Sequence, residues 1–140
     1  MNTIRPLLVI GAGKIGQVVA DLLAGSGDYA VTLADRDPAA LKSVRDGSRV
    51  RTLALDVGNR AALAEELKGP HRPFAVLSAA PFHLTLTVAE AARAAGVHYL
   101  DLTEDVASTQ RIRALAEGAD SAFIPQCGLA PGFISIVAAD

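Results

Sequence analysis

The six residues at 11–16, Gly-Ala-Gly-Lys-Ile-Gly, have the spacing of a glycine-rich turn that binds phosphate groups. They follow the apolar run at 7–10 and open a helical pattern at 15–23. A second apolar run, at 29–34, ends at the carboxylate of Asp35. A strand, a glycine turn, a helix and a second strand with a terminal acid form the βαβ unit that binds dinucleotides. The first chemistry that the sequence predicts is therefore the binding of a dinucleotide.

Each glycine of this turn has a separate expected role. Gly11 allows the backbone to leave the strand in a tight turn, and Gly13 leaves room for a pyrophosphate against the main chain. Gly16 lets the helix pack closely on the strand, and the free amides at the start of the helix hold the phosphates. Lys14 either flanks the phosphates or points into solvent. The candidate cofactor contacts in this segment are Gly11, Ala12, Gly13, Lys14, Ile15 and Gly16.

Asp35 is the residue from which we predict the choice of cofactor. A carboxylate at the end of the second strand accepts hydrogen bonds from the adenosine ribose and repels a 2′-phosphate, which favours NAD. Arg36 follows directly and could attract that phosphate instead, so NADP stays open. In the alternative interpretation, Asp35 and Asp37 only begin a turn. Asp37 is then the turn residue itself or the N-cap of a helix that Pro38 opens.

Short apolar runs alternate with helical patterns along the rest of the chain. This alternation predicts the α/β class, with a doubly wound six-stranded parallel sheet of the Rossmann type and the strand order 3-2-1-4-5-6. The apolar residues that recur at helical spacing in the first helix are expected to face the sheet: Val18, Val19, Leu22 and Leu23. The expected strands are 7–10, 29–34, 50–55, 74–78, 97–100 and 122–125, and the expected helices are 15–23, 41–44, 59–67, 85–95 and 106–117.

Ligands of such sheets bind at the carboxyl ends of the strands, where the strand order reverses. After the third strand, Asp56 could accept a hydrogen bond from the adenine amino group and Val57 could pack on the ring. Asp56 could equally be a turn residue. Small residues after the fourth strand let the middle of the cofactor approach the backbone, or serve tight packing only: Ser78, Ala79, Ala80 and Pro81. Asp101, Thr103 and Glu104 follow the fifth strand, and Gln126, Cys127 and Gly128 follow the sixth.

The composition excludes several classes of protein. The chain has 140 residues, of which 51% are hydrophobic, and no apolar run approaches the roughly 18 residues that a membrane span requires. A net charge of −2, scattered cations and no Trp give no sign of nucleic-acid binding. Its single cysteine and three dispersed histidines form no zinc-ligand pattern, so we expect no metal site. One cysteine and an N-terminus unlike a signal peptide indicate a cytoplasmic protein.

The carboxyl end of the sequence suggests a domain boundary. We expect a dinucleotide-binding domain over 1–130 and the start of a crossover helix over 131–140, which leads to a substrate domain outside this chain. The helical pattern at 134–140 has no stop signal, and it follows the loop Ala-Pro-Gly-Phe at 130–133.

Four segments of the chain match one known family: Gly11–Gly16, Ser78–His83, Ala95–Glu104 and Cys127–Phe133. Together they resemble the N-terminal domain of the saccharopine dehydrogenase family, and the resemblance spans nearly the whole chain. The resemblance implies an oxidoreductase that acts on a carbon–nitrogen bond of an amino acid or its imine. It also implies a second domain that carries much of the substrate site, and a homodimer, so that the 140 residues alone would bind cofactor without turnover. Glu104 stands where many relatives have glycine.

Reduction of an imine requires placement of a hydride, a proton for nitrogen and stabilisation of the iminium charge. The catalytic candidates are therefore Tyr99 as a hydrogen-bond donor, Asp101 as a partner for the cation and Cys127 against the nicotinamide ring. Each has a simpler interpretation: Tyr99 as a packed strand residue, Asp101 as a loop cap and Cys127 as a small apolar side chain.

Two other functions compete with this prediction. A regulatory NAD-binding module, of the kind that gates potassium transporters, shares the glycine motif and the terminal acid at a similar size. The Pro-Gly-Phe loop at 131–133 favours the two-domain enzyme instead. A sugar-nucleotide epimerase or short-chain reductase usually has a Tyr four residues before a Lys. Here Tyr29 is followed at that position by Leu33, and Tyr99 by Thr103.

Overall fold

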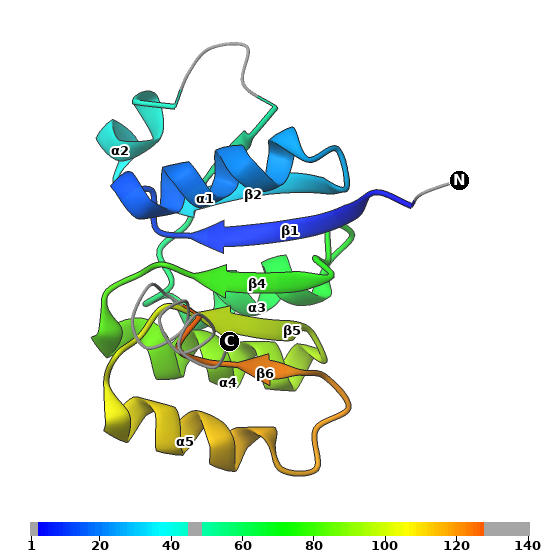
Figure 1. Cartoon of the computed structure of the whole chain (residues 1–140), viewed down its shortest axis with the longest axis vertical. Coiled ribbons are helices and arrows are strands. Elements are labelled where there is room, and N and C mark those ends of the chain that lie inside the picture. Colours follow the sequence, from blue (N-terminus) through cyan, green and yellow to red (C-terminus); the bar gives the residue numbers. More distant parts are fainter. Residues whose placement is uncertain (1–2, 45–48, 128–140) are drawn as a thin grey trace, which may run out of the picture.

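The computed structural model describes residues 3–44 and 49–127 (Figure 1). Its centre is one six-stranded sheet in the order β3-β2-β1-β4-β5-β6, and every neighbouring pair of strands is parallel. The predicted topology is therefore confirmed. The strands are β1 Arg5–Ile10, β2 Tyr29–Asp35, β3 Arg51–Ala54, β4 Ala75–Ser78, β5 His98–Asp101 and β6 Phe123–Ile124.

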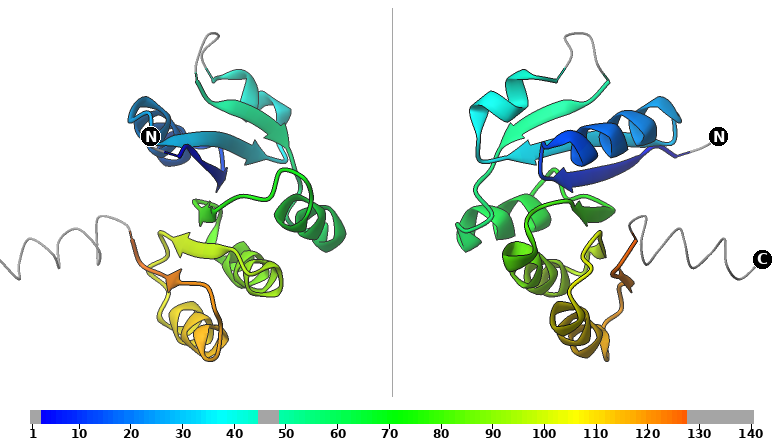
Figure 2. Two further views of the ribbon diagram at one scale, coloured as in Figure 1. Left: turned by 90° about the vertical axis from the view of Figure 1, so that its right-hand side faces the viewer. Right: turned by 60° about the vertical axis from the view of Figure 1, so that its left-hand side comes forward.

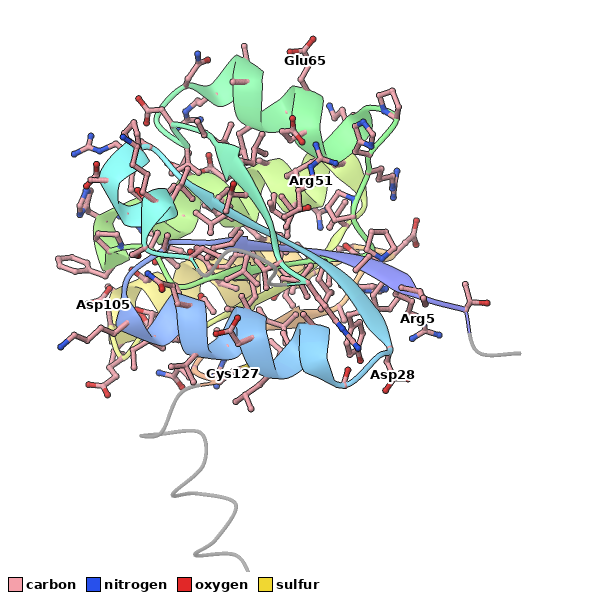
Figure 3. All side chains as sticks on the ribbon, turned by 90° about the horizontal axis from the view of Figure 1, so that it is seen from above. Arg5, Asp28, Arg51, Glu65, Asp105 and Cys127 are labelled. Carbon is pink, nitrogen blue, oxygen red and sulfur yellow. The ribbon has the colours of Figure 1, made fainter. Side chains whose placement is uncertain are left out.

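Helices cover both faces of the sheet. The residues of α1 and α2 pack with one apolar cluster, around Val9 and Leu33, and those of α3, α4 and α5 pack with a second cluster, around Val76 and Tyr99. Figures 2 and 3 show α1 and α4 on opposite sides of the sheet. The helices are α1 Lys14–Gly25, α2 Pro38–Lys42, α3 Arg60–Lys68, α4 Thr85–Ala95 and α5 Val106–Ala116, and the 3₁₀ turn η1 Phe82–Leu84 precedes α4.

Local signals in the sequence fix where several helices begin and end. Asp37 caps α2 by accepting from the Ala39 amide at 3.0 Å, and Asn59 caps α3 by accepting from the Ala62 amide at 3.2 Å. Gly96 ends α4 in the left-handed conformation, with φ of 69°. The hydrogen bonds that the cap residue Asp105 of α5 accepts from Ser108 lower the pKa of the Asp105 carboxyl.

The prediction for the inward face of α1 was wrong for Val18 and Leu22 and partly right for Leu23, which packs against the apolar cluster around Val9 and Leu33. Val18 and Leu22 are 57% and 70% exposed, and Val19 and Leu23 are only partly buried. The helix lies so close to the strands that its inward face has room only for small residues. Its buried residues are Gly16, Ala20 and Ala24.

Two further expectations concern the carboxyl end and the membrane. The proposed boundary at residue 130 and the crossover helix over 131–140 lie outside the described residues. Within the described part of the chain, no helix is both long and apolar enough to cross a bilayer.

Candidate functional site

The glycine turn between β1 and α1 takes a shape that side chains would prevent. Gly11 has φ of +105°, and a Cβ atom there would lie 2.8 Å from the carbonyl carbon and oxygen of Ala79 on the neighbouring segment. A Cβ atom on Gly16 would lie 1.7 Å from the Gly11 oxygen. The tight turn and the close helix–strand contact predicted for these two glycines are therefore both present.

The amino end of α1 is free of protein atoms where a phosphate group would bind. Gly13 is the N-cap residue and provides no side-chain cap, and its carbonyl accepts the first helical hydrogen bond, from the Gln17 amide at 3.0 Å. Apart from the two chain neighbours of Gly13, no atom of the described residues lies within 4 Å of the position that a Gly13 Cβ would occupy. Among the described residues, no acceptor contacts the amides of Lys14 and Ile15. These groups fit a diphosphate because they combine free donors, room and the positive end of a helix dipole.

Asp35 fixes the glycine turn to the end of β2. Its Oδ2 accepts from the Ala12 amide at 2.8 Å, and its Oδ1 accepts from the Asp37 amide at 2.9 Å. An ionised carboxylate has about four acceptor positions, so each oxygen keeps capacity for a ligand hydroxyl. The sequence predicted contact between Asp35 and a ligand, but no pattern in it indicated that this side chain also holds the glycine turn in place.

One cavity, of about 460 Å³, lies at the carboxyl ends of β2 and β3, and we call it the β2 cavity. Asp35, Arg36, Asp56 and Val57 all line it, as the sequence predicted for residues after these strands. Asp56 also closes a turn, because its Oδ1 accepts from the Gly58 amide at 2.9 Å. The remaining lining residues are Ile10, Gly11, Leu55, Gly58, Ala80, Pro81, His83 and Leu84.

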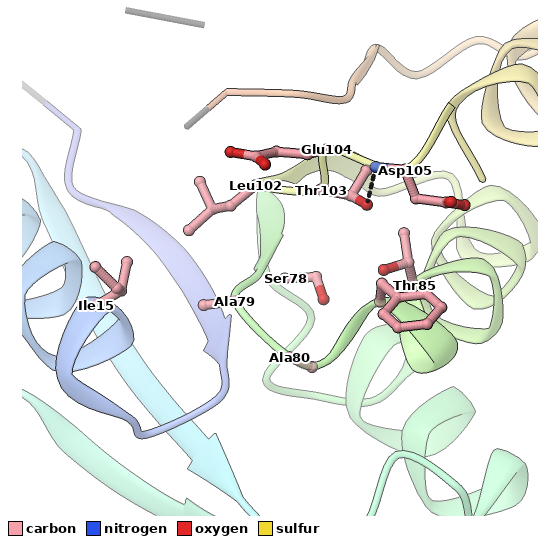
Figure 4. A pocket seen from close by; sticks show the side chains of 10 residues that line it. Ile15, Ser78, Ala79, Ala80, Thr85, Leu102, Thr103, Glu104 and Asp105 are labelled. Atoms are coloured by element: carbon pink, nitrogen blue, oxygen red, sulfur yellow. Dashed lines mark hydrogen bonds between the residues drawn. The ribbon is translucent and has the colours of Figure 1, made fainter. Parts of the chain in front are cut away.

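A second cavity, of about 440 Å³, lies at the carboxyl ends of β4 and β5, and we call it the β4 cavity (Figure 4). Ala80 lines both cavities, so they meet beside β1 and β4, the neighbours at which the strand order reverses. Such a crevice is where doubly wound sheets bind their ligands. The other residues that line the β4 cavity are Ile15, Ser78, Ala79, Phe82, Thr85, Leu102, Thr103, Glu104 and Asp105.

The sequence analysis did not anticipate that Phe82, Thr85, Leu102 and Asp105 line this cavity. Thr85 is the first residue of α4 and lies seven positions after Ser78, beyond the segment that the strand-end rule covers. Thr85 reaches the β4 cavity because the turn η1 directs the chain back over the end of β4. No sequence motif indicates that turn, although Pro81 just before it was a visible sign of a bend.

Two of the three catalytic candidates, Tyr99 and Asp101, are buried in the interior. Tyr99 is 0% exposed and Asp101 is 1% exposed, and neither lines the β2 or the β4 cavity. The Tyr99 hydroxyl donates to Asp101 Oδ2 at 2.6 Å, while Asp101 Oδ1 accepts from the amides of Thr103 and Gln126, each at 3.0 Å. Burial and the hydrogen bond to Asp101 raise the pKa of Tyr99 far above its usual value. Asp101 thus joins the segments that follow β5 and β6.

Cys127, the third candidate, lies at the carboxyl end of the described chain. Its amide donates to the Asp101 carbonyl at 2.7 Å, and its thiol donates to the Ile124 carbonyl at 3.0 Å. Burial and then the nearby Asp101 carboxylate raise the pKa of the Cys127 thiol. The group is therefore a neutral thiol at pH 7, and it lines neither of the two cavities.

Comparison with known proteins places this geometry in a family. The family model described as the saccharopine dehydrogenase NADP binding domain matches residues 7–124. A search of the curated proteins gives no match.

Solved structures share the fold. Apo saccharopine dehydrogenase (L-Glu forming) from Saccharomyces cerevisiae matches with a TM-score of 0.84 and 24% identity, over 96% of this chain and 29% of that chain. Apo scyllo-inositol dehydrogenase from Lactobacillus casei matches with a TM-score of 0.71 and 18% identity, over 89% of this chain and 37% of that chain. The enzyme WbmG from Bordetella bronchiseptica, in complex with NAD, has a TM-score of 0.61 and 15% identity, over 88% of this chain and 52% of that chain.

This chain therefore spans less than a third of the length of the yeast structure that it resembles. The family model covers most of the present sequence, including the glycine turn and the residues of both cavities. The chain therefore belongs to the saccharopine dehydrogenase family, as its NAD(P)-binding domain.

Proposed function

We propose that this chain binds NAD(H) for an oxidoreductase that acts on a carbon–nitrogen bond of an amino acid or its imine. The observation that carries the proposal is the uncapped amino end of α1, which lies between two cavities at the reversal of strand order. When bound, the nicotinamide group supplies the hydride donor or acceptor. The protein supplies binding, orientation and a site that excludes water.

The two cavities divide the cofactor between them. The β2 cavity takes the adenosine half, because Asp35 and Asp56 offer carboxylate acceptors for ribose and adenine groups and Val57 offers an apolar surface. The amides at the start of α1 hold the diphosphate beside Gly13. The β4 cavity, across the switch point, takes the nicotinamide half.

NAD(H) is the favoured form of the cofactor, with NADP(H) the weaker ligand. The Asp35 carboxylate is fixed by two amide donors at the wall of the β2 cavity, where it opposes the negative charge of a 2′-phosphate. Arg36 lines the same cavity, and its positive charge offsets part of the repulsion between Asp35 and a 2′-phosphate. We therefore expect NADP(H) to bind as well.

Tyr99 and Asp101 act as positioning residues in this proposal. The buried Asp101 carboxylate fixes the segment at Thr103, which lines the β4 cavity, and the segment at Gln126, which leads to Cys127. Acidic groups at the cavity itself, Glu104 and Asp105, favour a substrate nitrogen that carries positive charge.

Substitution of Gly13 tests the cofactor site. A methyl group at Gly13 meets no atom among the neighbours that the structure describes, so Gly13→Ala should lower the melting temperature only by the small cost of a poorer N-cap, yet it occupies space needed by a diphosphate. We expect the affinity for NADH, measured by fluorescence titration, to fall at least about ten-fold, which corresponds to about 1.4 kcal/mol. The control Gly25→Ala, at the other end of α1, should bind like the wild type. Equal NADH binding by Gly13→Ala, or tighter binding of NADPH than NADH by the wild type, would contradict the assignment.

The reaction class requires its own assay in the protein that carries this domain. Oxidation of NADH should need an amine and a carbonyl compound together, because the imine is the hydride acceptor. Each component alone should give no rate above background. Steady oxidation of NADH with a ketone in the absence of amine would indicate an alcohol dehydrogenase and refute carbon–nitrogen chemistry.

A further inference from the structure

The hydroxyl group of Ser78 is buried and has no hydrogen-bond partner among the described residues. Ser78 is the last residue of β4, is 2% exposed and lines the β4 cavity. A buried hydroxyl without a partner is uncommon in native proteins, because it loses its bonds to water without replacement. A partner from outside the protein, present when the cavity is filled, would remove this cost.

Thr85 places a second hydroxyl beside the first. It begins α4, is 2% exposed and lines the same cavity. Its carbonyl oxygen faces the interior, where it lies 3.4 Å from the Tyr99 hydroxyl oxygen. In Figure 4 the oxygens of Ser78 and Thr85 are turned toward one another. The hydroxyl of Thr103 differs from both, because its Oγ1 already accepts from the Asp105 amide at 3.1 Å.

The rest of the β4 cavity restricts the kind of group that can reach these hydroxyls. Apolar walls come from Ile15, Ala79 and Leu102, and acidic groups come from Glu104 and Asp105. No Lys or Arg lines this cavity among the described residues. The cavity therefore suits a flat apolar body, neutral or cationic, with a small uncharged polar group at its inner end, and it disfavours phosphates and carboxylates.

We propose that the hydroxyls of Ser78 and Thr85 bind the primary carboxamide of the nicotinamide ring. A carboxamide presents one acceptor oxygen and two N–H donors, and each hydroxyl can both donate and accept. The ring lies against the apolar walls, and the acidic groups favour the cationic, oxidised form. This inference rests on the proposed function, since it assigns two residues to a cofactor that the chain must first bind.

Three ligands separate the carboxamide from the rest of the cofactor. ADP-ribose lacks the nicotinamide ring, and 3-acetylpyridine adenine dinucleotide replaces the carboxamide with an acetyl group that cannot donate. Calorimetric titration of the wild type should rank NAD⁺ above the acetyl analogue and above ADP-ribose. Ser78→Ala should weaken NAD⁺ binding about ten-fold and leave ADP-ribose binding unchanged. Its melting temperature should not fall, because the hydroxyl has no partner to lose.

Matched variants complete the test. Thr85→Val, which keeps the shape and removes the hydroxyl, should also reduce NAD⁺ affinity selectively, whereas Thr85→Ser should retain it. Ser26→Ala changes an exposed serine beyond the end of α1, whose hydroxyl donates to the Leu23 carbonyl at 2.7 Å, and should not alter binding.

Equal loss of ADP-ribose and NAD⁺ affinity in Ser78→Ala would assign the hydroxyl to another part of the cofactor. Unchanged NAD⁺ affinity in both Ser78→Ala and Thr85→Val would refute the proposal and leave cofactor binding intact. A wild type that binds neither ligand would refute the proposed function itself.

Discussion

The helices α1 and α4 follow the two strands at the switch point, and both bury small residues, but only α4 also buries branched side chains, those of Thr85 and Val88. The inward side of α1 consists of Gly16, Ala20 and Ala24, while Val18 and Leu22 are exposed. In α4 the branched residue Val88 is fully buried, together with three alanines. The neighbours explain the difference: α4 packs against both α3 and α5, whereas the main contacts of α1 within the described chain are with β1 and β2.

This contrast separates two tasks that a helix next to a strand can perform. Close approach of α1 to β1 brings its bare amide groups to the edge of the sheet, and only glycine and alanine permit that approach. At α4, a turn of 3₁₀ helix separates the strand from the helix, which leaves room for larger side chains and a tighter apolar core. We therefore expect the position of α1 to serve ligand binding, whereas the buried face of α4 beyond Thr85 serves stability.

Enlarging the inward face of α1 should have the largest effect. In Gly16→Ala the added methyl group would overlap the Gly11 oxygen, a backbone atom that cannot rotate away. We expect a loss of about 3 kcal/mol or more in the free energy of unfolding, at or above the top of the usual range for overpacking. Urea denaturation followed by circular dichroism measures this value.

Gly25→Ala is the matched control for this change, because it makes the same substitution at the opposite end of the same helix. Beyond the chain neighbours and the backbone of α1 itself, no atom in the described part of the chain lies within 4 Å of the added group, so stability should stay constant or rise by about 0.5 kcal/mol. A small effect of Gly16→Ala, similar to that of Gly25→Ala, would show that α1 can move away from β1 and would remove the basis of the contrast.

The sequence predicted the elements well because their signals are local. Alternating apolar runs and helical patterns gave the six strands and their order, and the caps Asp37 and Asn59 were recognised from residue type and spacing. Val18 and Leu22 were wrongly assigned to the inward face of α1, because amphipathic spacing shows that a helix has an apolar face without showing what covers it. In α1 the requirement for close approach decided the orientation instead of side-chain hydrophobicity.

The candidate site was also partly predictable, because some of its residues occupy local positions that the sequence reveals. Residues next to a strand end, such as Asp35, Asp56 and Ser78, were identified because the fold places every strand end at one edge of the sheet. Thr85 was missed because its place depends on the path of the turn before α4. The burial of Tyr99 beneath that helix is likewise a property of packing, and no short motif encodes it.

Two Val→Ala substitutions test the difference between α4 and α1 with a smaller expected effect on stability. Val88→Ala removes two methyl groups from a fully buried position in α4, so the free energy of unfolding should fall by about 2 to 3 kcal/mol, from lost burial and the cavity that remains. Val18→Ala makes the same change at a position that is 57% exposed in α1. There the better helix propensity of alanine offsets the small loss of burial, and the change should stay within about 0.5 kcal/mol. Urea denaturation of the two variants under identical conditions gives the difference directly. Equal destabilisation would mean that the Val18 side chain is buried in solution. That result would contradict the conclusion that the outer face of α1 is exposed to solvent.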